Sequence, residues 1–320
     1  MPPASEVDKP IVALTGASGF LGRYLVAALH QAGYRVRILT RRDPHHTLWA
    51  GIDLEVVPGT LEDQQALDRL CLGVQAVVHG AGLIKARSRD DFLAVNRDGA
   101  GRLARAVSRL SPNAYFLLIS SLAARHPELS YYSESKLAGE EIVSAILPHD
   151  RLGILRPPAI YGPGDQETLV LFKLAKGPLA LLGQPRGSRL AIIHAEDAAR
   201  AVAALTQARL SGRWSLADQR PTGYDFGELL KVAADTLGAR PTYIQIPPAL
   251  IHVAGAASEY WGRITGRVVM LTRGKAREIT HKDWGVDPQD LPPADVWIPQ
   301  ITMPAGIAAT ARWYRSQNLV

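Results

Sequence analysis

Short apolar runs alternate with amphipathic segments along the first half of the chain. The first run, at residues 11–14, precedes a glycine-rich turn, and such a run is typical of a buried parallel strand. A helical pattern follows, with Leu21, Leu25 and Leu29 on one face, and Gly33 ends it. The same alternation predicts more elements, with strands at residues 35–40, 54–57, 76–79, 115–120 and 152–155, and helices at 62–72, 90–110 and 135–146. Strands that alternate with helices form a parallel sheet with helical crossovers, so we expect an α/β fold with a doubly wound, Rossmann-type sheet.

The alternation weakens after residue 160, where proline and glycine become more frequent. A strand is still expected at residues 191–194 and a helix at 196–207. We therefore expect a main α/β domain at residues 9–165, to which elements near 190–217 return. The rest of residues 166–320 is expected to form a smaller, mostly helical lobe that supplies most of the substrate site.

The composition narrows the class of protein. Of the 320 residues, 47% are hydrophobic and 21% are charged, which is ordinary for a soluble globular chain. The net charge of +6 comes from scattered basic residues, so no nucleic-acid partner is expected, whereas an anionic ligand suits this balance. Neither a signal peptide nor an apolar stretch long enough to span a bilayer is evident, so no membrane partner is expected. The one cysteine, Cys71, allows no intrachain disulfide and favours a reducing, cytoplasmic location. No metal site is expected.

The turn after the first strand has the sequence Thr15-Gly16-Ala17-Ser18-Gly19-Phe20-Leu21-Gly22. Gly16 permits a tight turn, Gly19 lets the backbone approach a phosphate, and Gly22 lets the helix pack closely on the strand. The helix N-terminus adds free N–H groups and the positive end of a dipole. Because the three glycines lie between a strand and a helix, the turn predicts a site for a dinucleotide pyrophosphate.

The end of the second strand bears on which dinucleotide is bound. NAD sites carry an acidic residue there, which binds the ribose 2′-hydroxyl. This chain has Thr40-Arg41-Arg42 instead, and a guanidinium binds a phosphate well. The sequence therefore favours NADP(H) over NAD(H); the alternative is that Arg41 and Arg42 are solvated loop residues.

Tyr132 and Lys136 lie four residues apart at the start of an expected helix, on one face of it. A tyrosine pKa of about 10 is too high for easy proton exchange at neutral pH, and a nearby ammonium lowers it. The pair is then a workable general acid/base for a carbonyl or an alcohol. Ser120 and Ser121 come at the end of the preceding strand, where a hydroxyl can hydrogen-bond the reacting oxygen.

Together these motifs resemble the extended short-chain dehydrogenase/reductase family, whose members are also called NAD-dependent epimerases/dehydratases. The resemblance implies a Rossmann-type fold and the activity of an NAD(P)-dependent oxidoreductase or isomerase. Four further segments carry it, namely Val78-His79-Gly80-Ala81-Gly82, Val95-Asn96-Arg97-Asp98-Gly99, Leu155-Arg156-Pro157-Pro158-Ala159-Ile160-Tyr161-Gly162-Pro163-Gly164 and Ile193-His194-Ala195-Glu196-Asp197.

The resemblance also implies roles for individual residues. Ser121 is expected to orient the substrate oxygen, Tyr132 to act as the acid/base, and Lys136 to hold the nicotinamide ribose and tune Tyr132. Asn96 matches the helix asparagine that the family carries near the site. The residues expected to bind the cofactor are Gly16, Ser18, Gly19, Phe20, Leu21, Gly22, Thr40, Arg41, Arg42, Thr60, Leu61, Gly80, Ala81, Gly82, Ser120, Pro157, Ala159 and Ile160.

Three features depart from the family pattern. The third strand is followed by Gly59-Thr60-Leu61, where the family carries an Asp for the adenine amine, so Thr60 weakens or changes that contact. The segment between Ser121 and Tyr132 is short, so the loop over the substrate is trimmed. Leu122-Ala123 stand where sugar 4,6-dehydratases have an acidic pair, which argues against that chemistry.

Three functions are open at this point. The favoured one is an oxidoreductase that transfers hydride between NADP(H) and a carbonyl or secondary alcohol. A nucleotide-sugar epimerase with tightly held NAD is the first alternative, and a non-catalytic dinucleotide-binding scaffold is the second. The expected partner is a small-molecule substrate, with an anionic compound such as a nucleotide sugar among the candidates. The helices at 90–110 and 135–146 resemble a dimer interface of the family, so a homodimer is one expected assembly.

Overall fold

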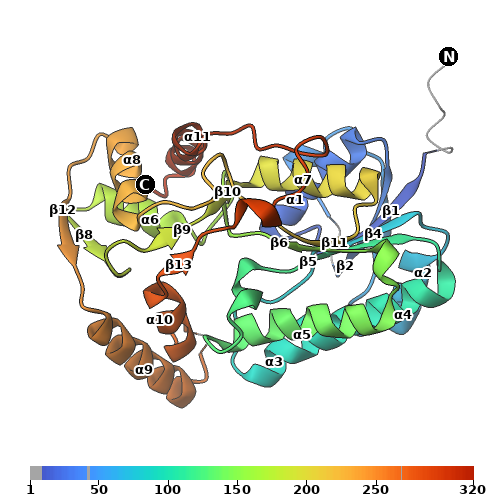
Figure 1. The fold of residues 1–320 in the computed structure, drawn as a ribbon, viewed down its shortest axis with the longest axis horizontal. Coiled ribbons are helices and arrows are strands. Elements are labelled where there is room, and N and C mark those ends of the chain that lie inside the picture. Colours follow the sequence, from blue (N-terminus) through green and yellow to red (C-terminus); the bar gives the residue numbers. More distant parts are fainter. Residues whose placement is uncertain (1–8, 42–43, 268) are drawn as a thin grey trace.

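A parallel sheet of seven strands forms the centre of the larger lobe, in the order β11-β6-β5-β4-β1-β2-β3 (Figure 1). The computed structural model describes residues 9–41, 44–267 and 269–320. The strands of the sheet are β1 Ile11–Thr15, β2 Arg35–Thr40, β3 Leu54–Pro58, β4 Ala76–His79, β5 Tyr115–Ile119, β6 Leu152–Arg156 and β11 Gly212–Ser215. From β1 the sheet grows through β2 and β3 on one side and through β4, β5, β6 and β11 on the other. Doubly wound sheets bind their ligands at the carboxyl ends of the strands where the order changes sides in this way, here β1 and β4. This arrangement confirms the predicted Rossmann-type fold class.

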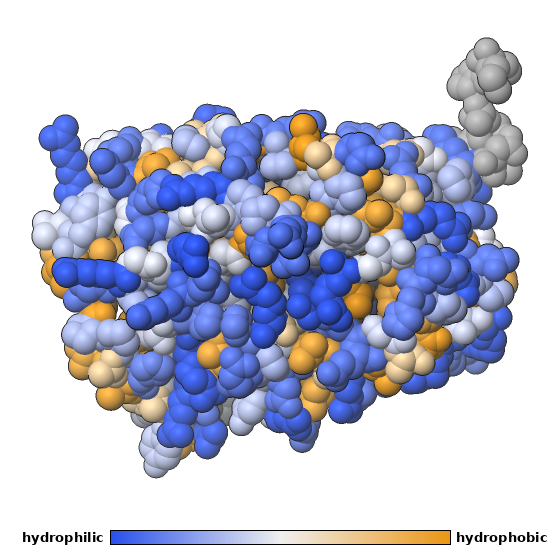
Figure 2. Space-filling model, viewed as in Figure 1, coloured by the Kyte–Doolittle hydropathy of each residue, from blue (hydrophilic) through white to orange (hydrophobic). Residues whose placement is uncertain are grey.

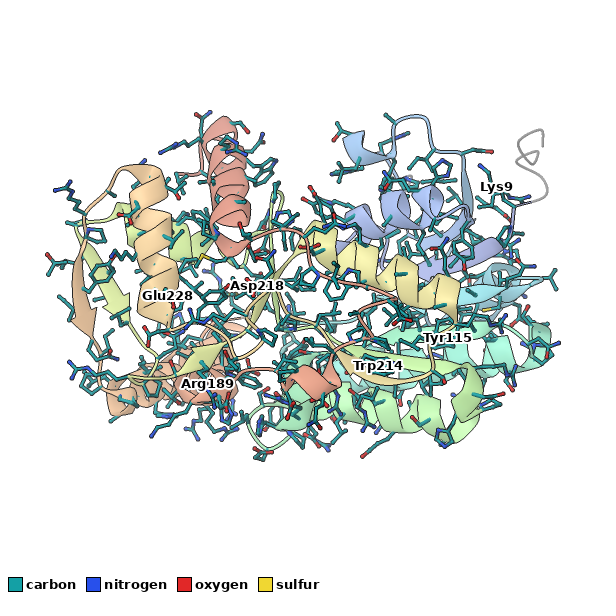
Figure 3. All side chains as sticks on the ribbon, turned by 45° about the horizontal axis from the view of Figure 1, so that its top comes forward. Lys9, Tyr115, Arg189, Trp214, Asp218 and Glu228 are labelled. Carbon is teal, nitrogen blue, oxygen red and sulfur yellow. The ribbon has the colours of Figure 1, made fainter. Side chains whose placement is uncertain are left out.

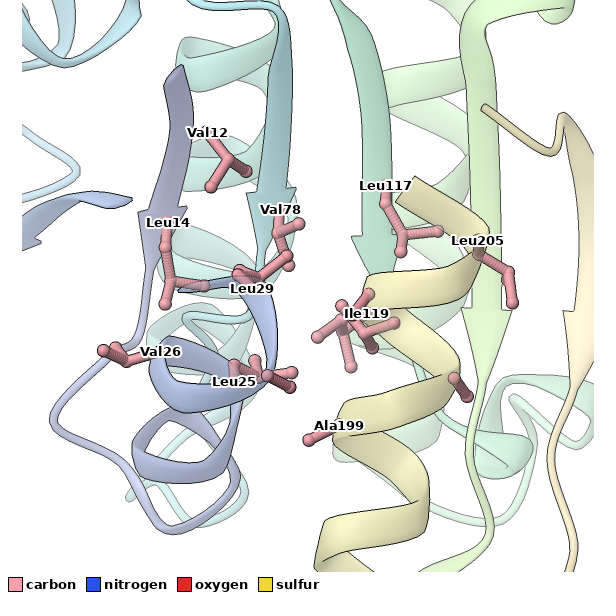
Figure 4. Close-up of a cluster of buried hydrophobic side chains, with 14 of the residues drawn as sticks. Val12, Leu14, Leu25, Val26, Leu29, Val78, Leu117, Ile119, Ala199 and Leu205 are labelled. Atoms are coloured by element: carbon pink, nitrogen blue, oxygen red, sulfur yellow. The ribbon is translucent and has the colours of Figure 1, made fainter. Parts of the chain in front are cut away.

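Helices cover both faces of the sheet, which explains why its strands are apolar runs. On one face, α1 (Phe20–Gln31) and α7 (Ala195–Ala208) pack against each other and against the strands. Figure 4 shows Leu25 and Leu29 of α1 in this core, together with Val78 of β4. The other face is covered by α2 (Gln64–Cys71), α4 (Ala100–Leu110) and α5 (Tyr131–Ile146), whose apolar side chains form a second buried core.

The predicted helices agree with the structure to within two residues at each end, except for two. The helix predicted at 90–110 consists of α3 (Arg89–Leu93), a π-helical stretch at Ala94–Gly99 and α4. The helix predicted at 135–146 is α5, which begins at Tyr131, so its predicted start was wrong. The reason is the cap: the hydroxyl of Ser130 accepts a hydrogen bond from the backbone N–H of Ser133 at 3.0 Å. Tyr132 therefore lies in the first turn of α5. The helices α4 and α5, which are expected from the sequence to form a dimer interface, pack side by side. The homodimer itself stays a prediction.

The smaller lobe is mostly helical, as predicted, and lies on the left in Figure 1. Its helices are α6 Leu169–Lys176, α8 Phe226–Leu237, α9 Pro248–Thr265, α10 Arg273–Thr280 and α11 Met303–Ser316. Three pairs of short parallel strands join them, β7 Ala159–Tyr161 with β10 Ile192–His194, β8 Leu179–Leu182 with β12 Thr242–Gln245, and β9 Arg189–Leu190 with β13 Asp283–Trp284. Short 3₁₀ helices lie at Thr47–Trp49, Leu122–Arg125, His149–Arg151 and Pro288–Asp290. Among the described residues, no helix combines the length and the apolar character that crossing a membrane requires.

Asp218 connects the last strand of the main sheet to the smaller lobe. Its backbone N–H donates to the carbonyl of Ile192 at 2.9 Å, and its carboxylate accepts from the hydroxyl of Tyr224 at 2.8 Å. In the view of Figure 3, Asp218 lies between Trp214 of the larger lobe and Glu228 of the smaller one. Burial raises the pKa of the Asp218 carboxyl. These bonds fix the chain where it passes from one lobe to the other.

Candidate active site

The glycine-rich turn has the shape that a dinucleotide pyrophosphate requires. Gly16 has a φ of +81°, and a Cβ added there would lie 2.6 Å from the backbone nitrogen of Ala81. A Cβ on Gly22 would lie 2.0 Å from the carbonyl oxygen of Gly16, so a side chain fits at neither position. Gly19 is exposed and is the N-cap of α1. The free N–H groups in the first turn of α1 are therefore available to a phosphate bound at this turn. The turn therefore fits the cofactor predicted from its sequence.

One large cavity runs from this turn to the smaller lobe. Its volume is about 2090 Å³, which exceeds the range of about 300–1,000 Å³ that is common for ligand pockets. Many of the predicted cofactor residues line it, namely Gly16, Gly19, Phe20, Leu21, Gly22, Gly80, Gly82, Ser120, Pro157, Ala159 and Ile160. The cavity has room for a dinucleotide and for a second, sizeable molecule.

Other predicted cofactor residues lie outside the cavity wall. Ser18 is exposed on the glycine-rich turn, and Ala81 donates its backbone N–H to the hydroxyl of Thr15 at 3.2 Å. Thr40 is buried at the end of β2, Arg41 after it is exposed, and Arg42 lies outside the described residues.

Thr60 and Leu61 follow β3 and are held by local contacts. The hydroxyl of Thr60 accepts from the backbone N–H of Glu62 at 3.2 Å. The side chain of Leu61 packs so closely on Gly99 that a Cβ added to Gly99 would lie 2.9 Å from it. Their predicted contacts with the adenine end of the cofactor stay a prediction.

Tyr132 faces the cavity from the first turn of α5 and is hydrogen-bonded to Ser121. Burial and the carboxylate of Glu278 raise the pKa of Tyr132, while the bond to Ser121 lowers it, and the result is a pKa of about 12. The neighbouring Tyr131 is 51% exposed, whereas Tyr132 is half-buried and packs near the ring of Phe92. The structure thus brings Ser121 and Tyr132 together and keeps the phenol protonated at neutral pH. The lowered tyrosine pKa predicted from the Tyr132/Lys136 spacing is not found, because burial outweighs the effects that lower it.

Lys136 reaches the same cavity one helical turn after Tyr132. Its ammonium donates to the carbonyl of Ile119, the last residue of β5, at 2.7 Å. Burial lowers the pKa of Lys136 to about 8, against the smaller, opposite effect of the Glu140 carboxylate. Lys136 is therefore a cation at neutral pH and is held at the carboxyl end of the sheet.

The two adjacent serines have different partners. Ser120 is 5% exposed, and its hydroxyl donates to the buried carboxylate of Glu140 at 2.5 Å. That carboxylate also accepts from the guanidinium of Arg156 at 2.6 and 2.8 Å. Ser121 is thereby left as the hydroxyl beside Tyr132. Sequence reasoning missed Glu140, although positions 132, 136 and 140 share one helical face and this spacing could have revealed it.

Asn96 lies in the π-helical stretch and hydrogen-bonds the backbone of a residue that lines the cavity. Its amide accepts from the N–H of Leu83 at 2.8 Å and donates to the carbonyl of Leu83 at 3.0 Å. It also donates to the hydroxyl of Ser135 at 2.8 Å. Leu83 lines the cavity, whereas Asn96 is 5% exposed, so Asn96 positions the backbone of Leu83. Stretches of π-helix often occur at functional sites. This one places the Asn96 amide between Leu83 and Ser135 of α5.

Thr15 and His79 form a further buried pair at the ends of β1 and β4. The hydroxyl of Thr15 and Nδ1 of His79 are 2.6 Å apart. Burial, with a smaller effect of Lys136, lowers the pKa of His79 to about 3, so the imidazole is neutral. The pair fixes the two strand ends between which the turn and the cavity lie.

Comparison with known proteins agrees with this geometry. The model of the NAD dependent epimerase/dehydratase family matches residues 12–215. A protein of Caulobacter vibrioides named ceramide reductase is 45% identical over 306 residues, which cover 96% of this chain and 95% of that protein. A Dictyostelium discoideum sterol-4-alpha-carboxylate 3-dehydrogenase, decarboxylating, is 26% identical over 58% of this chain and 64% of its own length. The solved structure of MoeE5 in complex with UDP-glucuronic acid and NAD shares the fold, with a TM-score of 0.72, 20% identity and coverage of 96% of this chain and 99% of that one.

These matches confirm the family that the sequence motifs indicated. The chain belongs to the NAD-dependent epimerase/dehydratase family. It is an NAD(P)-dependent enzyme and an oxidoreductase of that family.

Proposed function

We propose that this protein is an NADPH-dependent reductase that converts a ketone of a ceramide-type lipid into an alcohol. The observation that carries the proposal is the protonated Tyr132 hydrogen-bonded to Ser121 on the wall of a very large cavity. A reductase needs an acid that gives a proton to the carbonyl oxygen, and a phenol with a raised pKa holds that proton at neutral pH.

Each residue of the site has a chemical task in this proposal. A bound NADPH supplies the hydride that turns a carbonyl carbon into an alcohol carbon. The hydroxyl of Ser121 holds the carbonyl oxygen, and Tyr132 donates its phenolic proton to that oxygen as negative charge develops there. The ammonium of Lys136 stabilises the phenolate that remains and thereby lowers the cost of the proton transfer. Solvent returns a proton to Tyr132 after each turnover.

The preference for NADPH rests on the residues after β2. Thr40 stands where an NAD site carries a carboxylate, and Arg41 follows it as an exposed guanidinium. The 2′-phosphate that distinguishes NADPH from NADH would lie near the guanidinium of Arg41, and position 40 has no carboxylate that would repel it.

The lipid substrate is supported by two observations. The Caulobacter vibrioides relative, with 45% identity along almost its whole length, is named for a ceramide substrate. The cavity has a wall suited to acyl chains, because the part beyond the glycine-rich turn is lined by side chains such as Leu83, Leu171, Leu181 and Met270.

A nucleotide-sugar epimerase is the competing function, since solved structures of this fold hold UDP-sugars and NAD. Net consumption of NADPH separates the two. The proposed reductase oxidises NADPH in proportion to the keto-lipid supplied, and it leaves UDP-glucose and UDP-N-acetylglucosamine unchanged. Purification with tightly bound NAD, epimerisation of a UDP-sugar and no net use of NADPH would overturn the proposal.

A further inference from the structure

Helix α9 buries Ile251 and two glycines, and turns most of its large apolar residues outward. On the inner face, a Cβ added to Gly255 would lie 2.9 Å from the carbonyl oxygen of Thr272, and one added to Gly262 would lie 2.9 Å from the side chain of Val269. The helix therefore packs closely on the segment that leads to α10, and it does so through glycine. Of the large apolar side chains of α9, Ile251 is buried, whereas the others are exposed.

The outer face of α9 is apolar along its length. Its large exposed side chains recur at helical spacing and are Leu250, Val253, Tyr260, Trp261 and Ile264, with Met270 beyond the helix end. Val253, Trp261 and Ile264 are 66%, 63% and 62% exposed, which is unusual for three large apolar residues on one stripe. In Figure 2, hydrophobic residues are interspersed with hydrophilic ones over the lower left of the molecule, where Figure 1 shows α9. The stripe, called here the outer face of α9, is open to a partner.

Basic residues surround the outer face of α9. Residues 248–280 contain five basic and two acidic residues, a net charge of +3. Arg263 and Arg267 are exposed close to Trp261 and Ile264. Glu259 pairs with Arg263, and Glu278 pairs with Lys275, so both acidic residues are already engaged. An apolar stripe with a tryptophan and a tyrosine, flanked by unbalanced positive charge, has the chemistry of a helix that lies in the interface of an anionic bilayer.

We propose that the outer face of α9 docks on the surface of a membrane that contains anionic phospholipid. The helix has 18 residues, and residues such as Arg263 and Glu259 interrupt its apolar character, so it fits the plane of the interface and not a span. A second copy of this chain is a poorer occupant, because two such faces would bring together two net charges of +3. The prediction of no membrane partner rested on the absence of an apolar stretch long enough to span a bilayer. A helix that lies on the membrane surface contains no such stretch, so that criterion does not detect it.

The position of α9 gives this docking a consequence for the substrate. Gly262, Arg263 and Met270 line the same cavity that Tyr132 faces. A lipid leaving the bilayer beside α9 would therefore enter the cavity with little exposure of its chains to water. The docking itself does not depend on the proposed reductase function, since it is a property of the surface.

Sedimentation with phospholipid vesicles tests the docking. The full chain is mixed with vesicles of phosphatidylcholine alone or of equimolar phosphatidylcholine and phosphatidylglycerol. We expect binding to the anionic vesicles that weakens with added salt. Val253→Glu combined with Trp261→Glu should reduce this binding by about tenfold or more, because two apolar anchors become anions. Leu72→Glu, which changes an equally exposed apolar residue at the end of α2, is the matched control and should bind as the unmodified chain does.

The outcomes separate this proposal from its rivals. The proposal is overturned if the unmodified chain stays in the supernatant, or if the double variant binds as well as the control. It is equally overturned if the double variant changes only the oligomeric state in gel filtration, because α9 would then bind a second copy. Turnover of a short, water-soluble ketone reports on the reductase function separately. It should be the same in the double variant, since neither Val253 nor Trp261 lines the cavity.

Discussion

Tyr132 and Lys136 face one cavity from neighbouring turns of α5, yet Lys136 donates its hydrogen bond to the carbonyl of Ile119, while Tyr132 is bonded to Ser121. Burial moves the two pKa values apart, raising that of Tyr132 to about 12 and lowering that of Lys136 to about 8. At neutral pH the pair is therefore a neutral phenol beside a cation. This is the state from which a proton can be given to a substrate oxygen.

Replacing the phenol tests its role as the acid. Tyr132→Phe should lower kcat by about 10²–10⁴-fold, the usual contribution of a general acid, while the thermal shift caused by NADPH stays the same. Tyr131→Phe removes the same hydroxyl from the adjacent, exposed ring and should keep most of the activity. Equal activities of the two variants would show that Tyr132 is not the acid.

The pH profile of the reduction tests the charge on Lys136. The proposed mechanism needs Lys136 as a cation, because its charge stabilises the phenolate of Tyr132. Burial lowers the pKa of Lys136 in the free enzyme to about 8. The value of kcat/KM should therefore be level near neutral pH and fall as the pH rises through about 8, because the ammonium is then lost. A profile that stays level well above this pH, toward the pKa of Tyr132, would remove Lys136 from the mechanism.

Sequence patterns predict the elements that depend on local periodicity. The parallel sheet, the glycine-rich turn and the Tyr132/Lys136 pair all follow from residues within a few positions of one another. Glu140 lies one helical turn beyond Lys136, but its spacing does not say which serine it binds. The choice of Ser121 over Ser120 therefore came from the family resemblance. The outer face of α9 was also beyond sequence reasoning, because apolar residues at helical spacing look the same whether they face a core or water.

Arg41 tests the choice of cofactor. Arg41→Asp places a carboxylate after β2 that repels a ribose phosphate and accepts a bond from a ribose hydroxyl. The ratio of kcat/KM for NADPH to that for NADH should fall by about tenfold or more. Arg312→Asp makes the same change of charge at an exposed position of α11 and should leave the ratio unaltered. A ratio that is the same in both variants would refute a role for Arg41.

Two glycines of the turn separate cofactor binding from folding. Gly19 has a φ of −73°, and an added Cβ would lie 3.2 Å from the carbonyl oxygen of Gly16, so Gly19→Val should fold. Its side chain would occupy the place of the pyrophosphate, and NADPH should no longer raise the Tm. Gly22→Ala, whose Cβ would lie 2.0 Å from the same oxygen, should lower the Tm without any ligand. A full NADPH shift in Gly19→Val would place the dinucleotide elsewhere.

Transfer of deuterium from the cofactor to the substrate tests the central claim most directly. The enzyme is incubated with NADPH that carries deuterium at the transferable position of its nicotinamide, and with a ceramide-type lipid that carries a ketone. Mass spectrometry should find one deuterium in each alcohol formed, in proportion to the NADPH oxidised. An unlabelled lipid, unchanged NADPH and an epimerised UDP-sugar in a parallel sample would contradict the account.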